Sequence, residues 1–278
     1  MWGRGHCQMS STISAVPASD DPGYVHVGGR RLYLECAGQG SPTVILEAGA
    51  GRAHDTWDAV WSALTTLTRV CRYDRAGIGQ SERGPRPRTV QDVVTDLHAL
   101  LRAAPVSGPY LLVGHSLGGL IVRLYAGLHP EEVVGLVLLD SSHPDQLDRE
   151  RTVFLTRRSG ESESVQAFRA ESLNPNPARH IEGIDLQASV AQVRVAPIPT
   201  GLPIVVVSRG KPSDWPDDFP ADLVADLEHV WRGLQSDLLQ LSRDAKHLIA
   251  TQSSHFIQFD EPQLVVEAIR SAIAAARR

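Results

Sequence analysis

The chain has little cysteine, and its three cysteines have no close spacing. Cys7, Cys36 and Cys71 are an odd set that favours neither zinc ligation nor a disulfide framework, so we expect reduced, buried or incidental thiols. Residues 1–23 are small and polar and lack the positively charged start and apolar core of a signal peptide. We interpret them as a flexible N-terminal tail and take a cytoplasmic location as the default.

Long apolar runs and an excess of positive charge are also missing. No apolar run approaches the roughly 20 residues needed to cross a bilayer, so no membrane span is predicted. The formal net charge is −5 and no basic stripe is visible, which argues against a nucleic-acid partner. The composition is that of a globular protein. Hydrophobic residues make up 42% of the chain, which suffices for a sizeable core, and charged residues make up 21%, which is near the globular average and argues against a disordered protein.

Apolar segments alternate with helical patterns along most of the 278 residues. Apart from a hairpin pattern around Gly28-Gly29, the predicted strands are continuous apolar runs, which are typical of strands buried on both faces. We therefore predict an α/β fold with a mostly parallel central sheet and helices on both faces. The strands are expected at Tyr24–Val27, Arg31–Cys36, Thr43–Glu47, Val70–Tyr73, Tyr110–Gly114, Val133–Leu139, Pro203–Ser208 and His247–Thr251.

One segment interrupts this rhythm. Residues 144–200 are polar, carry Asn174-Pro175-Asn176-Pro177 and offer no convincing strand. We interpret them as a cap or lid inserted over the site, with a long disordered loop as the alternative. The core then comprises residues 24–143 and 201–278. An apolar ceiling over the site is predicted, with Phe168 and Trp215 in contact with substrate. Its expected members are Phe168, Leu173, Ile181, Ile184 and Leu186 in the cap, joined by Trp215 and Phe219 from the loop after the seventh strand. The alternative is that these residues only pack the cap against the sheet.

The most informative motif is Gly114-His115-Ser116-Leu117-Gly118, between a predicted strand and a predicted helix. This is the pattern of a nucleophile elbow, a tight turn that exposes a strained serine at the start of a helix. Small residues are needed beside the serine because bulky side chains would collide in the turn. Ser116 is therefore the predicted nucleophile.

A serine nucleophile needs a base, and the base needs an acid that orients it. His255 is the best candidate base, since it follows the last predicted strand at the sheet edge where Ser116 lies. His115, inside the elbow, is expected to line the turn and to contact substrate in the pocket. His143 is expected to line the pocket and contact substrate, or alternatively to cap a loop. The sequence leaves two candidates for the acid. Asp140 ends the sixth predicted strand and is favoured. Asp214 is the alternative, although it lies a few residues further beyond the seventh predicted strand than an acid there is expected to lie.

A tetrahedral intermediate also needs hydrogen-bond donors for its oxyanion. The backbone N–H of Leu117, directly after the nucleophile, is one predicted donor. The second is expected from the small-residue loop after the third predicted strand, where we favour Ala50. Gly49 in the same loop would let the backbone approach the substrate closely.

At residues 24–274 the chain resembles the α/β-hydrolase fold superfamily. Three segments resemble motifs of this superfamily: the elbow with Gly119, the loop Asp74-Arg75-Ala76-Gly77-Ile78-Gly79-Gln80-Ser81, and the histidine loop Ser254-His255-Phe256. Two features differ from many members: Ala48-Gly49 stands in place of His-Gly, and no acid directly follows the seventh predicted strand. Some branches take their acid from the end of the sixth strand, which is the main reason to prefer Asp140.

The resemblance implies acyl transfer from a small-molecule ester, lactone or thioester to water, without a metal or organic cofactor. A serine at 116 makes the dehalogenase and epoxide hydrolase reactions of this fold, which use an aspartate nucleophile, unlikely as the activity. Acyl transfer to an alcohol or amine, carbon–carbon bond hydrolysis, and a non-catalytic ligand-binding role remain open alternatives. The oligomeric state cannot be predicted from the sequence.

Overall fold

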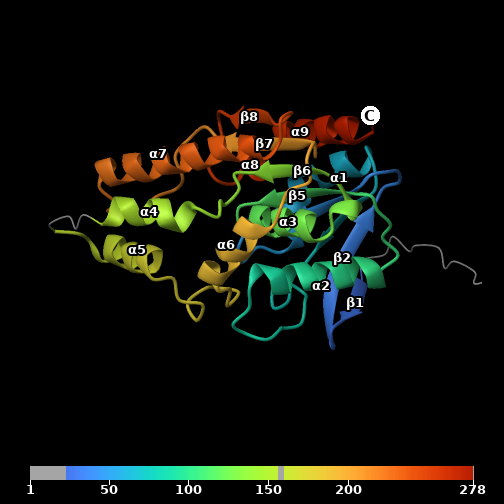
Figure 1. The fold of residues 1–278 in the computed structure, drawn as a ribbon, viewed down its shortest axis with the longest axis horizontal. Coiled ribbons are helices and arrows are strands. Elements are labelled where there is room, and N and C mark those ends of the chain that lie inside the picture. The colour runs from blue at the N-terminus through green and yellow to red at the C-terminus, as the bar shows by residue number, and fades with distance from the viewer. Residues whose placement is uncertain (1–22, 156–159, 278) are drawn as a thin grey trace, which may run out of the picture.

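The computed structural model describes residues 23–155 and 160–277. It contains one eight-stranded sheet in the order β1-β2-β4-β3-β5-β6-β7-β8 (Figure 1). Only β2 runs against the other strands, so the predicted α/β fold with a mostly parallel sheet is confirmed. The predicted tail at residues 1–23 lies outside the described residues except for Gly23. The strands are β1 Gly23–Val27, β2 Arg30–Ala37, β3 Thr43–Glu47, β4 Val70–Tyr73, β5 Tyr110–His115, β6 Val133–Leu139, β7 Ile204–Arg209 and β8 Lys246–Ala250.

Helices cover both faces of the sheet, which explains the continuous apolar strands. In β3, Ile45 packs with α2 (Val90–Ala103) and α3 (Leu117–Leu128), while its neighbours Val44 and Leu46 pack with α1 (Asp58–Thr65) and α9 (Pro262–Ala276). Successive side chains of a strand point to opposite faces, so a strand covered on both faces is apolar at consecutive positions along most of its length.

A second group of helices lies to one side of the sheet (Figure 1). Within residues 144–200 are α4 (Gln146–Phe154), α5 (Glu163–Leu173) and α6 (Leu186–Val195). Helix α4 packs against α5 and also against α7 (Ala221–Asp237), while α6 packs on α2 and α3. The predicted cap therefore shares an apolar cluster with α7, which the predicted boundaries assigned to the core. The members of that cluster are Phe154, Val165, Phe219, Leu223 and Leu227.

The expectation of reduced thiols is wrong for two of the cysteines. Strands β2 and β4 pair in antiparallel register with Cys36 opposite Cys71, and a disulfide joins them. The two cysteines lie 35 positions apart, and their pairing depends on β2 lying beside β4, which the sequence does not show. Cys7 lies outside the described residues. Disulfides are rare in cytosolic proteins, so this bond does not favour the cytoplasmic location, which stays a prediction.

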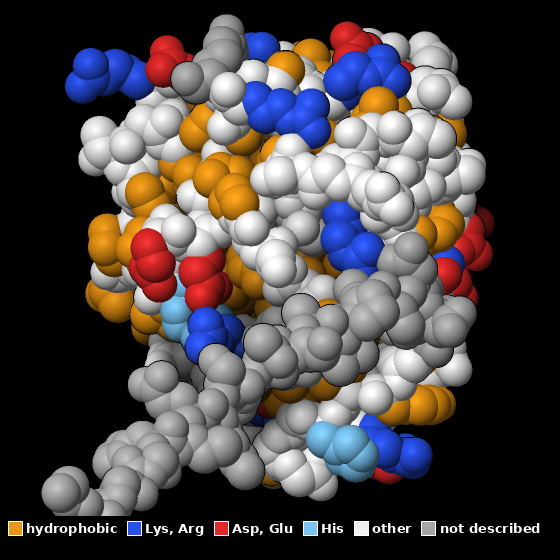
Figure 2. All heavy atoms as spheres, turned by 90° about the vertical axis from the view of Figure 1, so that its right-hand side faces the viewer, with side chains coloured by type: hydrophobic (Ala, Val, Ile, Leu, Met, Phe, Trp, Pro, Cys, Tyr) orange, Lys and Arg blue, Asp and Glu red, His pale blue; other side chains and the backbone are white. Residues whose placement is uncertain are grey.

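The described helices and one face of the surface concern the predictions about membranes and nucleic acid. Within the described residues, no helix is both long and apolar enough to cross a membrane. On the face shown in Figure 2, basic and acidic side chains are interspersed among apolar ones rather than gathered by sign. The absence of a nucleic-acid partner stays a prediction.

Candidate functional site

Ser116 occupies the turn between β5 and α3, as the elbow pattern predicts. It is the N-cap residue of α3, with φ 53° and ψ −120°. A positive φ is unfavourable for any residue with a Cβ, and such strain is typically held in place by surrounding packing at functional sites. The turn places Ser116 beside the positive end of the α3 dipole.

The packing that holds this turn leaves no room for side chains at three neighbouring glycines. A Cβ on Gly114 would lie 2.5 Å from the Gly118 carbonyl oxygen, and one on Gly118 would lie 2.4 Å from the Glu47 carbonyl oxygen. A Cβ on Gly119 would lie 1.7 Å from Ser141 Oγ. The glycines are therefore required by close backbone approach between α3 and the ends of its neighbouring strands.

The structure brings His255 to Asp140, the favoured acid. His255 Nδ1 lies 2.6 Å from Asp140 Oδ2, and Asp140 directly follows β6 with a positive φ of 37°. Asp140 is fully buried, whereas His255 is half-buried. Among the described residues, the side chain of the alternative acid, Asp214, makes no hydrogen bond or ion pair, although it lines a cavity near Ser116.

Two further side chains hold the Asp140 carboxylate. Trp231 Nε1 on α7 donates a 2.8 Å hydrogen bond to Oδ1, and Arg209 Nη1 at the end of β7 donates a 2.7 Å bond to Oδ2. Burial raises the pKa of Asp140, but the His255 hydrogen bond, the Arg209 charge and the Trp231 hydrogen bond together lower it below its ordinary value. A buried carboxylate is thus kept ionised beside His255.

Sequence reasoning missed both of these partners. Trp231 belongs to a helical apolar pattern, and Arg209 simply ends a strand. The adjacency of β6 and β7 brings Arg209 beside Asp140, and this adjacency cannot be read from either segment alone.

Two cavities meet at Ser116. The larger, about 590 Å³, is lined by Ser116 and His255, and the smaller, about 130 Å³, is lined by Ser116, Ala50 and Leu117. Four aromatic side chains line the larger cavity, and the first three of them belong to the predicted ceiling: Phe168, Trp215, Phe219 and Trp231. His143, predicted to line the pocket, lines the smaller cavity together with His180, which the sequence analysis did not single out.

The residues of the two predicted oxyanion donors, Leu117 and Ala50, line the same small cavity as Ser116. The Leu117 N–H is the first of α3, where N–H groups have no intrahelical acceptor. Within the described part of the chain, the Ala50 N–H donates no hydrogen bond. Both groups are therefore free to bind an oxygen placed beside Ser116.

Two predicted substrate contacts are not brought to either cavity. His115 is 1% exposed, and its Nε2 lies 2.8 Å from the His255 carbonyl oxygen, so it supports the loop that carries His255. Burial, with a smaller contribution from His255, lowers the pKa of His115 to about 3, which keeps its ring neutral. Gly49 is buried, and a Cβ there would lie 2.8 Å from His115 Nδ1. Strand alternation turns His115 inward, away from the exposed side of the turn.

A buried arginine joins the predicted cap to the sheet. Arg75 follows β4 and is 3% exposed. Its guanidinium lies 2.5 Å from Glu47 Oε1 at the end of β3, and it donates hydrogen bonds of 2.6 and 2.8 Å to the two carboxylate oxygens of Glu182. Glu182 lies within residues 144–200, so the ion pair connects that segment to the strand ends beside Ser116.

The same groups hold the loop that carries Ala50. Arg75 donates to the Ala48 and Gly49 carbonyl oxygens at 2.7 and 2.6 Å, and Glu182 Oε1 accepts the Gly51 N–H at 2.8 Å. Burial raises the pKa of Glu182, but the charge and hydrogen bonds of Arg75 more than offset this, and its pKa lies below the ordinary value. The charged pair therefore fixes the backbone on both sides of Ala50.

We expect Glu182→Ala to lower the free energy of unfolding by about 3 kcal/mol, because it leaves Arg75 buried with one carboxylate instead of two. Turnover of any substrate should also fall, since the Gly51 N–H loses its acceptor. Urea denaturation measures the first effect. Glu267→Ala, on the exposed face of α9, is the matched control and should change stability by less than about 0.5 kcal/mol. Equal effects of the two substitutions would contradict a structural role for the ion pair.

Comparison with known proteins shows the family to which the chain belongs. The model of a family described as "alpha/beta hydrolase fold" matches residues 42–187, more than half of the chain. The chain belongs to the alpha/beta hydrolase fold family. This hydrolase-fold chain is also 31% identical to the protein YqjL of Bacillus subtilis (strain 168) over 242 residues, which cover 86% of each chain.

Solved structures share the hydrolase fold at lower identity. A thermophilic esterase from Thermogutta terrifontis superposes with a TM-score of 0.59 at 19% identity, over 93% of this chain and 100% of the esterase. The meta-cleavage product hydrolase from Pseudomonas fluorescens IP01 gives 0.58 at 16% identity, over 91% of this chain and 98% of that chain. At these identities the likeness concerns the fold alone.

Proposed function

We propose that this hydrolase-fold chain is a serine hydrolase that cleaves a carboxylic ester, or a related lactone or thioester, through an acyl-enzyme intermediate. One observation carries the proposal: strained Ser116 lines one cavity with His255, and His255 Nδ1 lies 2.6 Å from buried Asp140. A base oriented by a buried carboxylate, in the same cavity as a half-buried serine, is the arrangement that activates a hydroxyl.

In the proposed reaction, Ser116 Oγ attacks the substrate carbonyl carbon while His255 Nε2 takes the hydroxyl proton. The carbonyl oxygen becomes an oxyanion and accepts hydrogen bonds from the Leu117 and Ala50 N–H groups. The carbon–oxygen bond to the leaving alcohol then breaks, and His255 returns the proton to that alcohol. Water, deprotonated by His255, attacks the acyl-enzyme and releases the acid, which restores Ser116. Asp140 keeps the His255 tautomer that has its proton on Nδ1.

The shapes of the two cavities support a substrate with unequal halves. The larger cavity holds a packed aromatic group, in which the Phe168, Trp215 and Phe219 ring centroids lie 5.5–5.7 Å apart. Burial of apolar substrate surface against these rings contributes about 25 cal/mol per Å². We therefore propose a bulky apolar group on that side of the scissile carbonyl and a small group in the cavity that Ala50 lines.

The test is covalent labelling of the wild-type protein with a fluorophosphonate, followed by mass spectrometry of its peptides. We expect one adduct, on Ser116, because an activated serine is phosphonylated far faster than an ordinary one. Heat-unfolded protein is the control and should not be labelled. If native Ser116 carries no adduct, the hydrolase mechanism is wrong and a ligand-binding role takes its place. A labelled Ser116 without turnover across an ester series would instead favour carbon–carbon bond hydrolysis or acyl transfer.

A further inference from the structure

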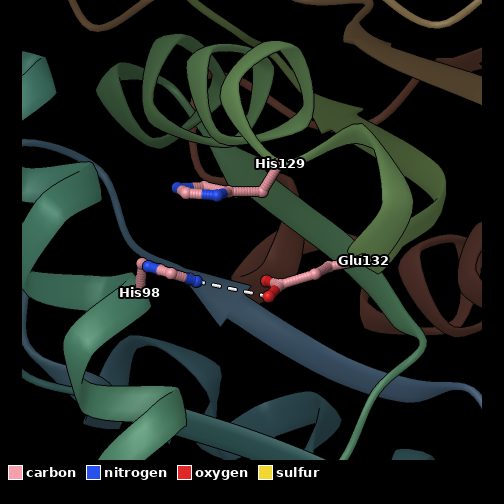
Figure 3. Close-up of side chains that lie close together, drawn as sticks. All are labelled: His98, His129 and Glu132. Carbon is pink, nitrogen blue, oxygen red and sulfur yellow. Dashed lines mark hydrogen bonds and ion pairs between the residues drawn. The ribbon is translucent and has the colours of Figure 1, made fainter.

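A cluster of two histidines and a glutamate lies away from the proposed active site (Figure 3). His98 comes from α2, His129 caps the C-terminus of α3, and Glu132 ends the short helix η2 (Pro130–Glu132). Ser116 caps the other end of α3, and twelve helical residues at about 1.5 Å each place the cluster roughly 18 Å away. None of the three residues lines either cavity at Ser116.

The spacing of their polar atoms suits a metal ion. His98 Nε2 lies 3.2 Å from Glu132 Oε1, and one ligand atom from each of the three residues lies within 4.8 Å of the others. Two ligand atoms bound to tetrahedral zinc at 2.0–2.1 Å are about 3.3 Å apart. The His98–Glu132 pair therefore already has this spacing. His129 would have to rotate out of its stack on His98 to bind the same ion, because a metal ion lies in the plane of each imidazole ring that binds it.

The surroundings of the cluster orient the Glu132 carboxylate. Tyr125 Oη donates a 2.6 Å hydrogen bond to Glu132 Oε2, which leaves Oε1 directed at His98. Outer contacts of this kind commonly orient metal ligands. The His98 and His129 rings are stacked, with centroids 3.9 Å apart, and all three residues are half-buried, so an ion can reach them. In residues 23–155 and 160–277, no lysine or arginine forms an ion pair with Glu132.

We propose that His98, His129 and Glu132 bind one divalent transition-metal ion of the zinc class, with water in the remaining position. Imidazole nitrogens select zinc, nickel, cobalt or copper over magnesium and calcium, which prefer oxygen ligands only. The ion would join the C-terminal halves of α2 and α3 to the segment that leads into β6. Its distance from Ser116 assigns it to stabilising the fold rather than to the proposed hydrolysis.

The experiment uses the untagged full chain, stripped with EDTA and titrated with Zn²⁺ by calorimetry. We expect one equivalent to bind, and His98→Gln and His129→Gln each to weaken binding at least tenfold. At a hundredfold excess over Kd, zinc should raise the Tm of the wild type by on the order of 5 °C. His229→Gln, which removes an exposed histidine of α7, is the matched control and should bind like the wild type.

Two further measurements keep the test decisive if a histidine variant unfolds. Glu132→Gln preserves the side-chain shape and should also weaken binding, and Zn²⁺ should shift two histidine ring signals in the ¹⁵N NMR spectrum of the wild type. Equal zinc affinity in the wild type and in Glu132→Gln would overturn the proposal. So would zinc shifts at histidines other than His98 and His129.

Discussion

Asp140→Asn is expected to lower kcat about 10⁴-fold, whereas Asp214→Asn should leave it within about twofold. The first substitution keeps the size of the side chain but replaces a carboxylate oxygen 2.6 Å from His255 Nδ1. An amide cannot stabilise the imidazolium by charge, and its NH₂ group favours the tautomer that places the imidazole proton on Nε2. His255 would then face Ser116 with a donor where the mechanism needs an acceptor.

The surroundings of Asp140 make this comparison interpretable. Arg209 also donates to Glu228 at 3.0 Å, so its charge keeps a partner when Asp140 becomes asparagine. The fold should therefore survive, which thermal unfolding can check. Asp214 lines the same cavity, so Asp214→Asn is the matched control, which removes one carboxylate charge from that cavity. The assignment of the acid is wrong if Asp214→Asn causes the larger loss of kcat on a chromogenic ester.

The sheet was predictable because its physical requirements are local. A strand covered by helices on both faces is apolar at consecutive positions, and residues 44–46 of β3, 133–139 of β6 and 204–207 of β7 show this directly in sequence. The elbow was predictable for a similar reason, since glycines beside Ser116 are required by contacts within one turn and its nearest strands. Both patterns lie within short, continuous segments.

Features that depend on pairing between distant segments were not predictable in this way. The Cys36–Cys71 bond requires β2 to lie beside β4, and the Arg75–Glu182 pair joins residues 107 positions apart. His115 was expected in the pocket because it lies within the elbow, yet strand alternation turns it toward the His255 backbone. In each case the decisive information is which elements are neighbours in space.

The proposed metal-binding cluster of His98, His129 and Glu132 was also not predictable from the sequence. A search for metal ligands by cysteine spacing finds nothing, while His129 and Glu132 are three positions apart and His98 lies on a different helix. The His129–Glu132 spacing was the only signal in the sequence, and many unrelated segments carry it. Packing of α2 against α3 supplies the rest.

Ser116→Ala is expected to abolish ester hydrolysis, with a loss in kcat of about 10⁶-fold, because no nucleophile remains for His255 to activate. Ser116→Gly should lose activity to the same extent. The two variants differ in stability, since the position has φ 53° and strain there costs of order 1–3 kcal/mol for a residue with a Cβ. Glycine relieves the strain, but its unfolded chain has more conformational freedom, which lowers the free energy of unfolding by about 0.4–1 kcal/mol relative to alanine.

On balance, Ser116→Gly should be more stable than Ser116→Ala by about 1 kcal/mol, measured by urea denaturation. Gly160→Ala, in another position with positive φ but with no atoms near the added Cβ, calibrates the conformational cost alone. Equal stability of the two Ser116 variants would mean that the turn relaxes freely, and the elbow would not store strain. A stable, inactive glycine variant would instead show that the fold keeps a less favourable backbone at this position for the sake of its hydroxyl.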